Sequence, residues 1–85
     1  MFFVYLLKSD INGLSYVGST SIDVVRRLEQ HNIGSNIWTK KNGPFKLVYY
    51  ESYKNVSDAK YREGNLKRFA QAYSQLKRRI KNSLE

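Results

Sequence analysis

The chain has 85 residues, enough for one small domain, and its composition, 41% hydrophobic and 14% aromatic, is that of a globular protein rather than a disordered one. Fifteen Lys and Arg residues against seven Asp and Glu give a net charge of +8, which indicates a polyanionic partner, either nucleic acid or an anionic membrane surface. The absence of cysteine excludes disulfides, and a single histidine argues against a zinc site. The apolar start, Met1 to Leu7, is too short for a signal peptide or a membrane span, so we expect a cytoplasmic location.

The first half of the chain predicts two strands and a helix. The short apolar run from Phe2 to Lys8 predicts a strand buried on both faces, and therefore central in its sheet. The hairpin dipeptide Asn12-Gly13 leads to a return strand from Leu14 to Ser19. We expect Thr20 or Ser21 to cap a helix from about Ile22 to His31 with an apolar stripe of Val24, Val25 and Leu28.

The second half begins with a polar segment, Asn32 to Pro44, which predicts a long loop. A third strand follows from Phe45 to Tyr53, with Tyr49 and Tyr53 on one face and Tyr50 on the other. We expect Ser57 to cap a helix that runs to about Phe69 and buries Ala59, Leu66 and Phe69. A last helix from Tyr73 or Ser74 to Leu84 buries Leu76, Ile80 and Leu84. The order ββαβαα predicts one α/β (α+β) domain over residues 1–85, with helices packed on a small mixed or antiparallel sheet.

Glu63 breaks the pattern of its helix. It lies four residues after Ala59 and three before Leu66, so it shares their inward stripe. A carboxylate on an apolar face is costly unless it is paired or bound to a metal. The sequence leaves two readings, a salt bridge to a neighbouring Lys or Arg and a metal-binding or catalytic carboxylate.

Arg27 and His31 lie one turn apart and share a helix face, which is either a solvated surface or a grip for a phosphate. Tyr5 and Tyr16 lie on paired strands, where core packing is the ordinary role of tyrosine. Gly18 lies inside a strand, where glycine marks a close backbone approach or a bend.

The basic residues are unevenly distributed, and most of the excess lies in residues 54–85. The run around Ile80 predicts either a solvated helix face or a phosphate-binding face. The candidate nucleic-acid contacts are Arg26, Lys40, Lys41, Lys77, Arg78, Arg79 and Lys81.

The chain resembles the GIY-YIG endonuclease superfamily, and within it the small stand-alone bacterial members. The resemblance rests on several segments in the right order and spacing over nearly the whole chain. They are Phe3-Val4-Tyr5, Tyr16-Val17-Gly18 with Ser19 and Thr20, the helix segment from Arg26 to Asn32, Lys46-Leu47-Val48-Tyr49, and the helix with Asp58-Ala59, Arg62-Glu63 and Leu66-Lys67.

The resemblance implies a three-stranded antiparallel sheet flanked by helices and the hydrolysis of a DNA phosphodiester. By the same resemblance Tyr5 and Tyr16 line the site, and one of them is the general base. Arg27 steadies the phosphate, although Arg26 is an alternative because the spacing from Tyr16 is about one residue long. His31 occupies the position one turn on, and Glu63 holds a single divalent metal, Mg²⁺ or Mn²⁺.

The leading hypothesis is therefore a metal-dependent DNA endonuclease, acting in repair or on branched or damaged DNA. The alternative is a nucleic-acid-binding module with the same fold that cleaves weakly or not at all. A protein-interaction subunit is less favoured, and a membrane role least, because the apolar stripe of the last helix is needed for the core. The sequence leaves open whether the chain is a monomer or a homodimer.

Overall fold

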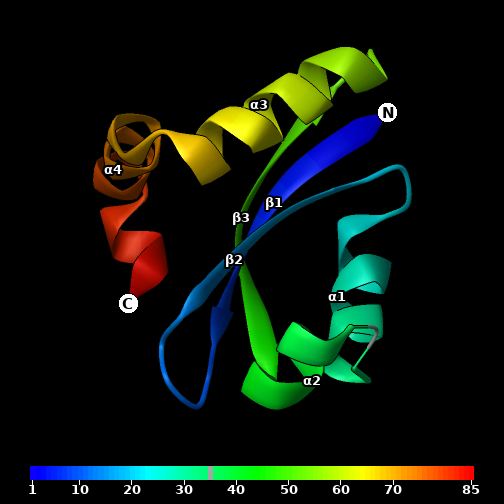
Figure 1. Ribbon diagram of the computed structural model, residues 1–85, viewed down its shortest axis with the longest axis vertical. Helices are drawn as coiled ribbons and strands as arrows, with labels where there is room; N and C mark the ends of the chain where they lie inside the picture. Colours follow the sequence, from blue (N-terminus) through cyan, green and yellow to red (C-terminus); the bar gives the residue numbers. More distant parts are fainter. Residues whose placement is uncertain (35) are drawn as a thin grey trace.

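The computed structural model describes residues 1–34 and 36–85, and in this part of the chain three strands form one antiparallel sheet in the order β2-β1-β3 (Figure 1). The strands are β1 (Phe2–Ser9), β2 (Ser15–Thr20) and β3 (Phe45–Tyr53). The predicted α+β fold, the element order and the central position of the first strand are confirmed. The third strand has the predicted bounds.

The sheet separates two apolar clusters because successive side chains of a strand point to opposite faces. Val4 and Leu6 of β1 pack into one cluster, and Tyr5 and Leu7 pack into the other. All four side chains are at most 2% exposed. Helices lie on both sides of the sheet in Figure 1, so β1 is covered above, below and along both edges.

Helix α1 (Val24–Asn32) covers the face that carries Tyr5. It begins two residues later than predicted because the cap is neither Thr20 nor Ser21. The Asp23 carboxylate accepts hydrogen bonds from the backbone amides of Val25 and Arg26 and caps the helix. Val25, predicted to be buried, is exposed, since the inward stripe runs through Val24, Leu28 and His31.

The predicted loop from Asn32 to Pro44 is wrong in part, because it contains helix α2 (Ile37–Asn42). Asn36 and Thr39 form a reciprocal capping box, in which each side chain accepts from the other's backbone amide. Ser35, within the same predicted loop, lies outside the described residues. A short helix therefore stands beside α1, next to the start of β3 (Figure 1).

Helices α3 (Val56–Arg68) and α4 (Ala70–Arg79) cover the opposite face, and a 3-10 turn, η1 (Lys81–Leu84), ends the chain. Ala59, Leu66 and Leu76 are buried as predicted, and Ile80 and Leu84 also pack into this cluster. Phe69 was predicted to be buried but is 57% exposed. It has an extended backbone and forms the corner between α3 and α4, so it leaves the inward stripe and α4 begins earlier than predicted.

A cluster of polar side chains links α3 to β3 by hydrogen bonds. Tyr49 and Tyr53 both donate hydrogen bonds to the Glu51 carboxylate, so these three residues share a face, as the predicted alternation requires. Arg62 of α3 also donates to Glu51 at 2.7 Å. Tyr50 points to the other face and is half exposed. None of the helices in the described residues is both long and apolar enough to cross a membrane.

Candidate active site

Tyr5 and His31 form the buried centre of the candidate site. The Tyr5 hydroxyl lies 2.8 Å from His31 Nε2, and the two residues are 2% and 0% exposed. Tyr16 packs its ring against His31 with a centroid distance of 4.9 Å and lies 6.5 Å from the Tyr5 ring. The structure therefore brings together three of the residues predicted for the site, one each from β1, β2 and α1.

Gly18 is what allows the Tyr5 hydroxyl to reach the edge of the sheet. Gly18 pairs with Tyr5 across the β1–β2 ladder, and the Tyr5 ring lies over its backbone. A Cβ atom at position 18 would approach Tyr5 Cζ to 2.6 Å, closer than carbon atoms pack. The glycine is therefore a place of close approach, one of the two roles that the sequence indicated.

His31 is held in its neutral form. Burial, and to a smaller extent the positive charge of the nearby Arg27 guanidinium, together lower the pKa of His31 to about 4. Its Nδ1 atom is buried without a hydrogen-bond partner in the described residues. Near neutral pH, Nε2 of a neutral imidazole can accept the Tyr5 hydroxyl proton when the tautomer places hydrogen on Nδ1.

The electrostatic setting of Tyr5 has two opposing parts. Burial raises the pKa of the Tyr5 hydroxyl above its ordinary value, while the positive charge of Arg27 opposes that rise. Burial is the larger effect, so the free protein keeps Tyr5 protonated.

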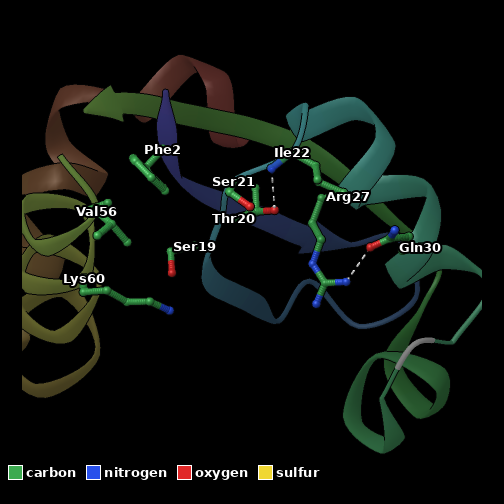
Figure 2. A pocket seen from close by; sticks show the side chains of 10 residues that line it. Phe2, Ser19, Thr20, Ser21, Ile22, Arg27, Gln30, Val56 and Lys60 are labelled. Atoms are coloured by element: carbon green, nitrogen blue, oxygen red, sulfur yellow. Dashed lines mark hydrogen bonds between the residues drawn. The ribbon is translucent and has the colours of Figure 1, made fainter. Parts of the chain in front are cut away.

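A cleft of about 520 Å³ opens beside this centre, between the start of α1 and α3. Figure 2 shows Arg27 and Lys60 on opposite sides of it, with Ser19 between them. The Arg27 side chain is half-buried, and its Nη1 donates to Gln30 Oε1 at 2.6 Å, which fixes the guanidinium within the cleft. Tyr5, Tyr16 and His31 do not line the cleft. The edge strand β2 connects these three residues with the cleft, because Gly18 lies against Tyr5 and the next residue, Ser19, lines the cleft.

Glu63 lies behind Ser19, with its side chain 15% exposed. Ser19 Oγ donates to one carboxylate oxygen at 2.6 Å, and Lys67 Nζ donates to the other at 2.8 Å. Lys60 Nζ is 3.6 Å from the first oxygen. Burial tends to raise the pKa of Glu63, but the bonds from Lys67 and Ser19 outweigh burial and hold the pKa below its ordinary value. Glu63 is therefore ionised at neutral pH, and it makes the salt bridges that were one of its two predicted readings.

The donor set decides which metal Glu63 suits. The described residues contain no group of three or more His, Cys, Asp or Glu side chains placed to hold a metal, so a fully protein-ligated ion such as structural zinc does not fit. Mg²⁺ is different, since it keeps several waters and is bound by one or two carboxylates together with substrate phosphate. One ionised carboxylate beside an open cleft fits that chemistry, and the two lysines on it are about half exposed or more and can move.

The other predicted positions separate into distinct places. Arg26 is exposed, whereas its neighbour Arg27 lines the cleft. Lys40 and Lys41 are exposed on α2. The remaining basic residues lie at the end of α4 and in η1, across the sheet from α1 and α2 (Figure 1), and these are Lys77, Arg78, Arg79 and Lys81. The basic residues therefore form two groups on opposite sides of the molecule.

Sequence reasoning did not give the partners of the site residues. Ser19 followed the second half-motif but received no role, although it bridges β2 to Glu63. Lys60 and Lys67 stand at helical spacing from Glu63, a signal that is visible in the sequence. Trp38 was not considered, because it lay in the predicted loop. It stacks on Tyr16 and on Phe45, at centroid distances of 5.4 and 5.5 Å.

Comparison with known proteins gives the family that the sequence motifs indicated. The family model of the GIY-YIG catalytic domain matches residues 1–78, so the chain belongs to the GIY-YIG family, whose members are nucleases that act on DNA and commonly use divalent metals. It is 35% identical over 69 residues to a UPF0213 protein of Listeria monocytogenes serotype 4b, with 80% of this chain and 75% of the relative covered.

Two further UPF0213 proteins are similar to a comparable extent. The one from Clostridium perfringens is 38% identical over 69 residues, with 80% of this chain and 72% of the relative covered. The one from Staphylococcus aureus strain Mu50 is 40% identical over 68 residues, with 79% and 80% covered. These names state no activity. No solved structure gives a significant match to the chain.

Proposed function

We propose that this protein is a DNA endonuclease that depends on Mg²⁺ or Mn²⁺ and hydrolyses phosphodiester bonds in the cleft between α1 and α3. One observation carries the proposal. Arg27 stands on one side of that cleft, and on the other Ser19 holds the ionised Glu63 carboxylate. A fixed cation in the cleft, and a carboxylate able to bind metal directly behind Ser19 of its lining, suit an anionic substrate whose charge increases during the reaction.

Arg27 binds the scissile phosphate. Its guanidinium is always charged, and its planar set of donors matches two phosphate oxygens. The bond to Gln30 restricts the side chain before substrate arrives, so less conformational freedom is lost on binding. A divalent ion bound at Glu63 would act as a Lewis acid on the same phosphate and neutralise charge on the leaving oxygen.

Tyr5 and His31 move the proton. In the free protein the Tyr5 hydroxyl is buried and does not line the cleft, so in this scheme the bound substrate brings the attacking water to it. Tyr5 then accepts a proton from that water while its own proton passes to His31 Nε2, 2.8 Å away. The water oxygen forms its bond to phosphorus, the bond from phosphorus to the leaving oxygen breaks, and that oxygen takes a proton from solvent. His31 then returns its proton to solvent through Tyr5.

Substrate itself makes His31 a better base in this scheme. In the free protein the pKa of His31, about 4, is too low for an effective base at neutral pH. Burial is the larger cause of that low value and Arg27 is the smaller one, and a phosphate anion on Arg27 opposes the contribution of Arg27. The proton relay is therefore weakest when the cleft is empty.

We propose that the protein acts in the cytoplasm, in DNA repair or on branched or damaged DNA, and membership of a DNA nuclease family supports the choice of DNA. The chain presents a single set of these residues, so one chain makes one cut, and a double-strand break requires either two binding events or a homodimer.

The direct test is nicking of supercoiled plasmid with Mg²⁺ or Mn²⁺ by the wild-type chain and by Glu63→Ala. We expect nicking by the wild type and its loss, by about 100-fold or more, in the variant. Asp58→Ala is the matched control, because it removes an exposed carboxylate from the same helix and should keep nicking. Equal nicking by wild type and Glu63→Ala would contradict the proposal.

A second function is favoured by one observation. Lys67 and Lys60 already neutralise Glu63, as expected if the carboxylate is structural and the protein is a nucleic-acid-binding module that does not cleave. This reading predicts that the wild type shifts DNA in a gel but does not nick it with either metal, and that Glu63→Ala unfolds at a lower temperature with unchanged DNA affinity.

A further inference from the structure

Helix α2 and the residue that follows α1 carry three apolar side chains that remain exposed. Ile33, at the end of α1, is 85% exposed, Ile37 is 87% exposed, and Trp38 remains 37% exposed although two aromatic rings pack on it. We call these three residues the α2 platform. Burying such side chains against a ligand is favourable, so their exposure indicates a partner.

The α2 platform is continuous with the candidate active site. Trp38 stacks on Tyr16 at 5.4 Å, and Tyr16 packs against His31 at 4.9 Å. Gly34 lies against Lys40 of α2, since a Cβ atom at Gly34 would be 3.1 Å from Lys40 Cβ. A group that rests on Trp38 is therefore one aromatic ring, that of Tyr16, away from His31.

The charge around the platform selects the kind of partner. Helix α2 has the sequence Ile-Trp-Thr-Lys-Lys-Asn, with two exposed lysines and no acidic residue. A second copy of this chain, which also carries +8, would be repelled. Nucleic acid can contact both the lysines and the apolar side chains. Its phosphates pair with Lys40 and Lys41, and its base faces are apolar enough to cover the side chains of the platform.

Fully paired DNA cannot cover this surface well, because its base faces are stacked on one another and only base edges reach the grooves. An unpaired nucleotide exposes its whole ring. We propose that the α2 platform receives an unstacked base of the DNA strand being cut, so that the preferred substrate contains unpaired nucleotides. The proposal rests on the proposed function for its choice of DNA, but it concerns binding and does not require cleavage.

The experiment measures binding without divalent ions, so that no strand is cut. Fluorescently labelled paired duplex, and the same duplex with an unpaired bulge, are titrated with the wild type, Ile33→Ser, Ile37→Ser and Phe69→Ser. Phe69 is the matched control, an exposed apolar side chain on the far side of the sheet. Trp38 is the single tryptophan of the chain, so its intrinsic emission reports contact at the platform in the same titration.

We expect the wild type to bind the bulged duplex more tightly and the bulged duplex to quench Trp38 emission more strongly. Ile33→Ser and Ile37→Ser should weaken binding of the bulged duplex about fivefold or more, while binding of paired duplex changes less than about twofold. Phe69→Ser should leave both affinities unchanged.

Three results would overturn the proposal. They are equal weakening for both DNAs, a shift from dimer to monomer in sedimentation caused by Ile37→Ser, and binding to anionic vesicles that Ile37→Ser abolishes. Plasmid nicking by the wild type separates the two proposals, because nicking without a preference for the bulge removes only this inference.

Discussion

Gly18 and Tyr5 face each other across the β1–β2 ladder with no room for a side chain at position 18. Alanine there would collide with the Tyr5 ring, and Tyr5 cannot move away because it is packed in the core. We expect Gly18→Ala to lower the free energy of unfolding by about 1–3 kcal/mol, as overpacked cores do. Urea unfolding followed by circular dichroism measures this change.

Gly64→Ala is the control for Gly18→Ala. Gly64 lies inside α3, and a Cβ atom there would meet nothing within 4 Å. Alanine is the better helix former, so this variant should gain about 0.5–1 kcal/mol. If the two variants change the free energy of unfolding in opposite directions, the collision at Tyr5 is separated from the general effect of losing a glycine. If both variants are more stable than the wild type, Tyr5 adjusts easily to the added methyl group.

Tyr5→Phe and Tyr16→Phe separate the two tyrosines. Of these two hydroxyls, only that of Tyr5 has a side-chain proton acceptor among the described residues, namely His31 Nε2. We expect Tyr5→Phe to reduce the single-turnover cleavage rate by about 100-fold or more and Tyr16→Phe by less than about tenfold. A larger loss in Tyr16→Phe would assign the general base to Tyr16.

The stability of the protein should depend on pH through His31. Its pKa is about 4 when folded and 6.5 when unfolded, so between these values the unfolded chain holds a proton that the folded chain lacks. Stability is then full above pH 6.5 and falls as the pH drops from 6.5 to 4, by up to about 3 kcal/mol. Urea unfolding across this range measures it.

His31→Gln provides the control, and the comparison is clean because the chain has one histidine. Above pH 4.5, the variant should lose most of the dependence of stability on pH. The Glu51 and Glu63 carboxylates contribute little there, because 4.5 is their ordinary pKa and the folded protein holds both pKa values below it. An unchanged slope in His31→Gln would place the titrating group elsewhere.

In the proposed reaction, Ser19 positions Glu63. Ser19→Ala removes the 2.6 Å bond to the carboxylate, so we expect about tenfold slower cleavage together with a higher Mn²⁺ concentration for half-maximal rate. Metal-free binding to DNA should not change. Ser19→Thr keeps the hydroxyl and should restore activity, and Ser21→Ala, a change at a serine that lines the same cleft, should have little effect. A loss of the same size in Ser21→Ala would deny Ser19 a special role.

Strong local patterns made the sheet predictable. Phe45 to Tyr53 is aromatic and bounded by a proline turn, and β1 is apolar on both faces because it lies between two clusters. Helix α2 was missed because a polar segment between Gly34 and Gly43 has no apolar period. Its cap depends on Asn36 and Thr39 bonding to each other's backbone, which becomes evident only once the two residues are in place.

The candidate site was predictable in its residue types but not in its contacts. The spacing of Arg27 and His31 placed them on one helix face, yet one of them is fully buried and the other lines a cleft. That difference depends on where the edge strand β2 runs, which the helix pattern does not contain. In the same way, the inward stripe gave the position of Glu63, while its bond to Ser19 spans 44 positions in the chain.

Because β1 lies between two apolar clusters, the position of Tyr5 depends on the cooperative unfolding of the whole domain. No part of the sheet can open without uncovering one side of this strand, so its amide hydrogens should exchange with solvent only when the whole domain unfolds. Helix α2, six residues long and largely exposed, should exchange through small local openings. Heating should therefore loosen the surface beside the cleft first and leave Tyr5 in place until the final transition.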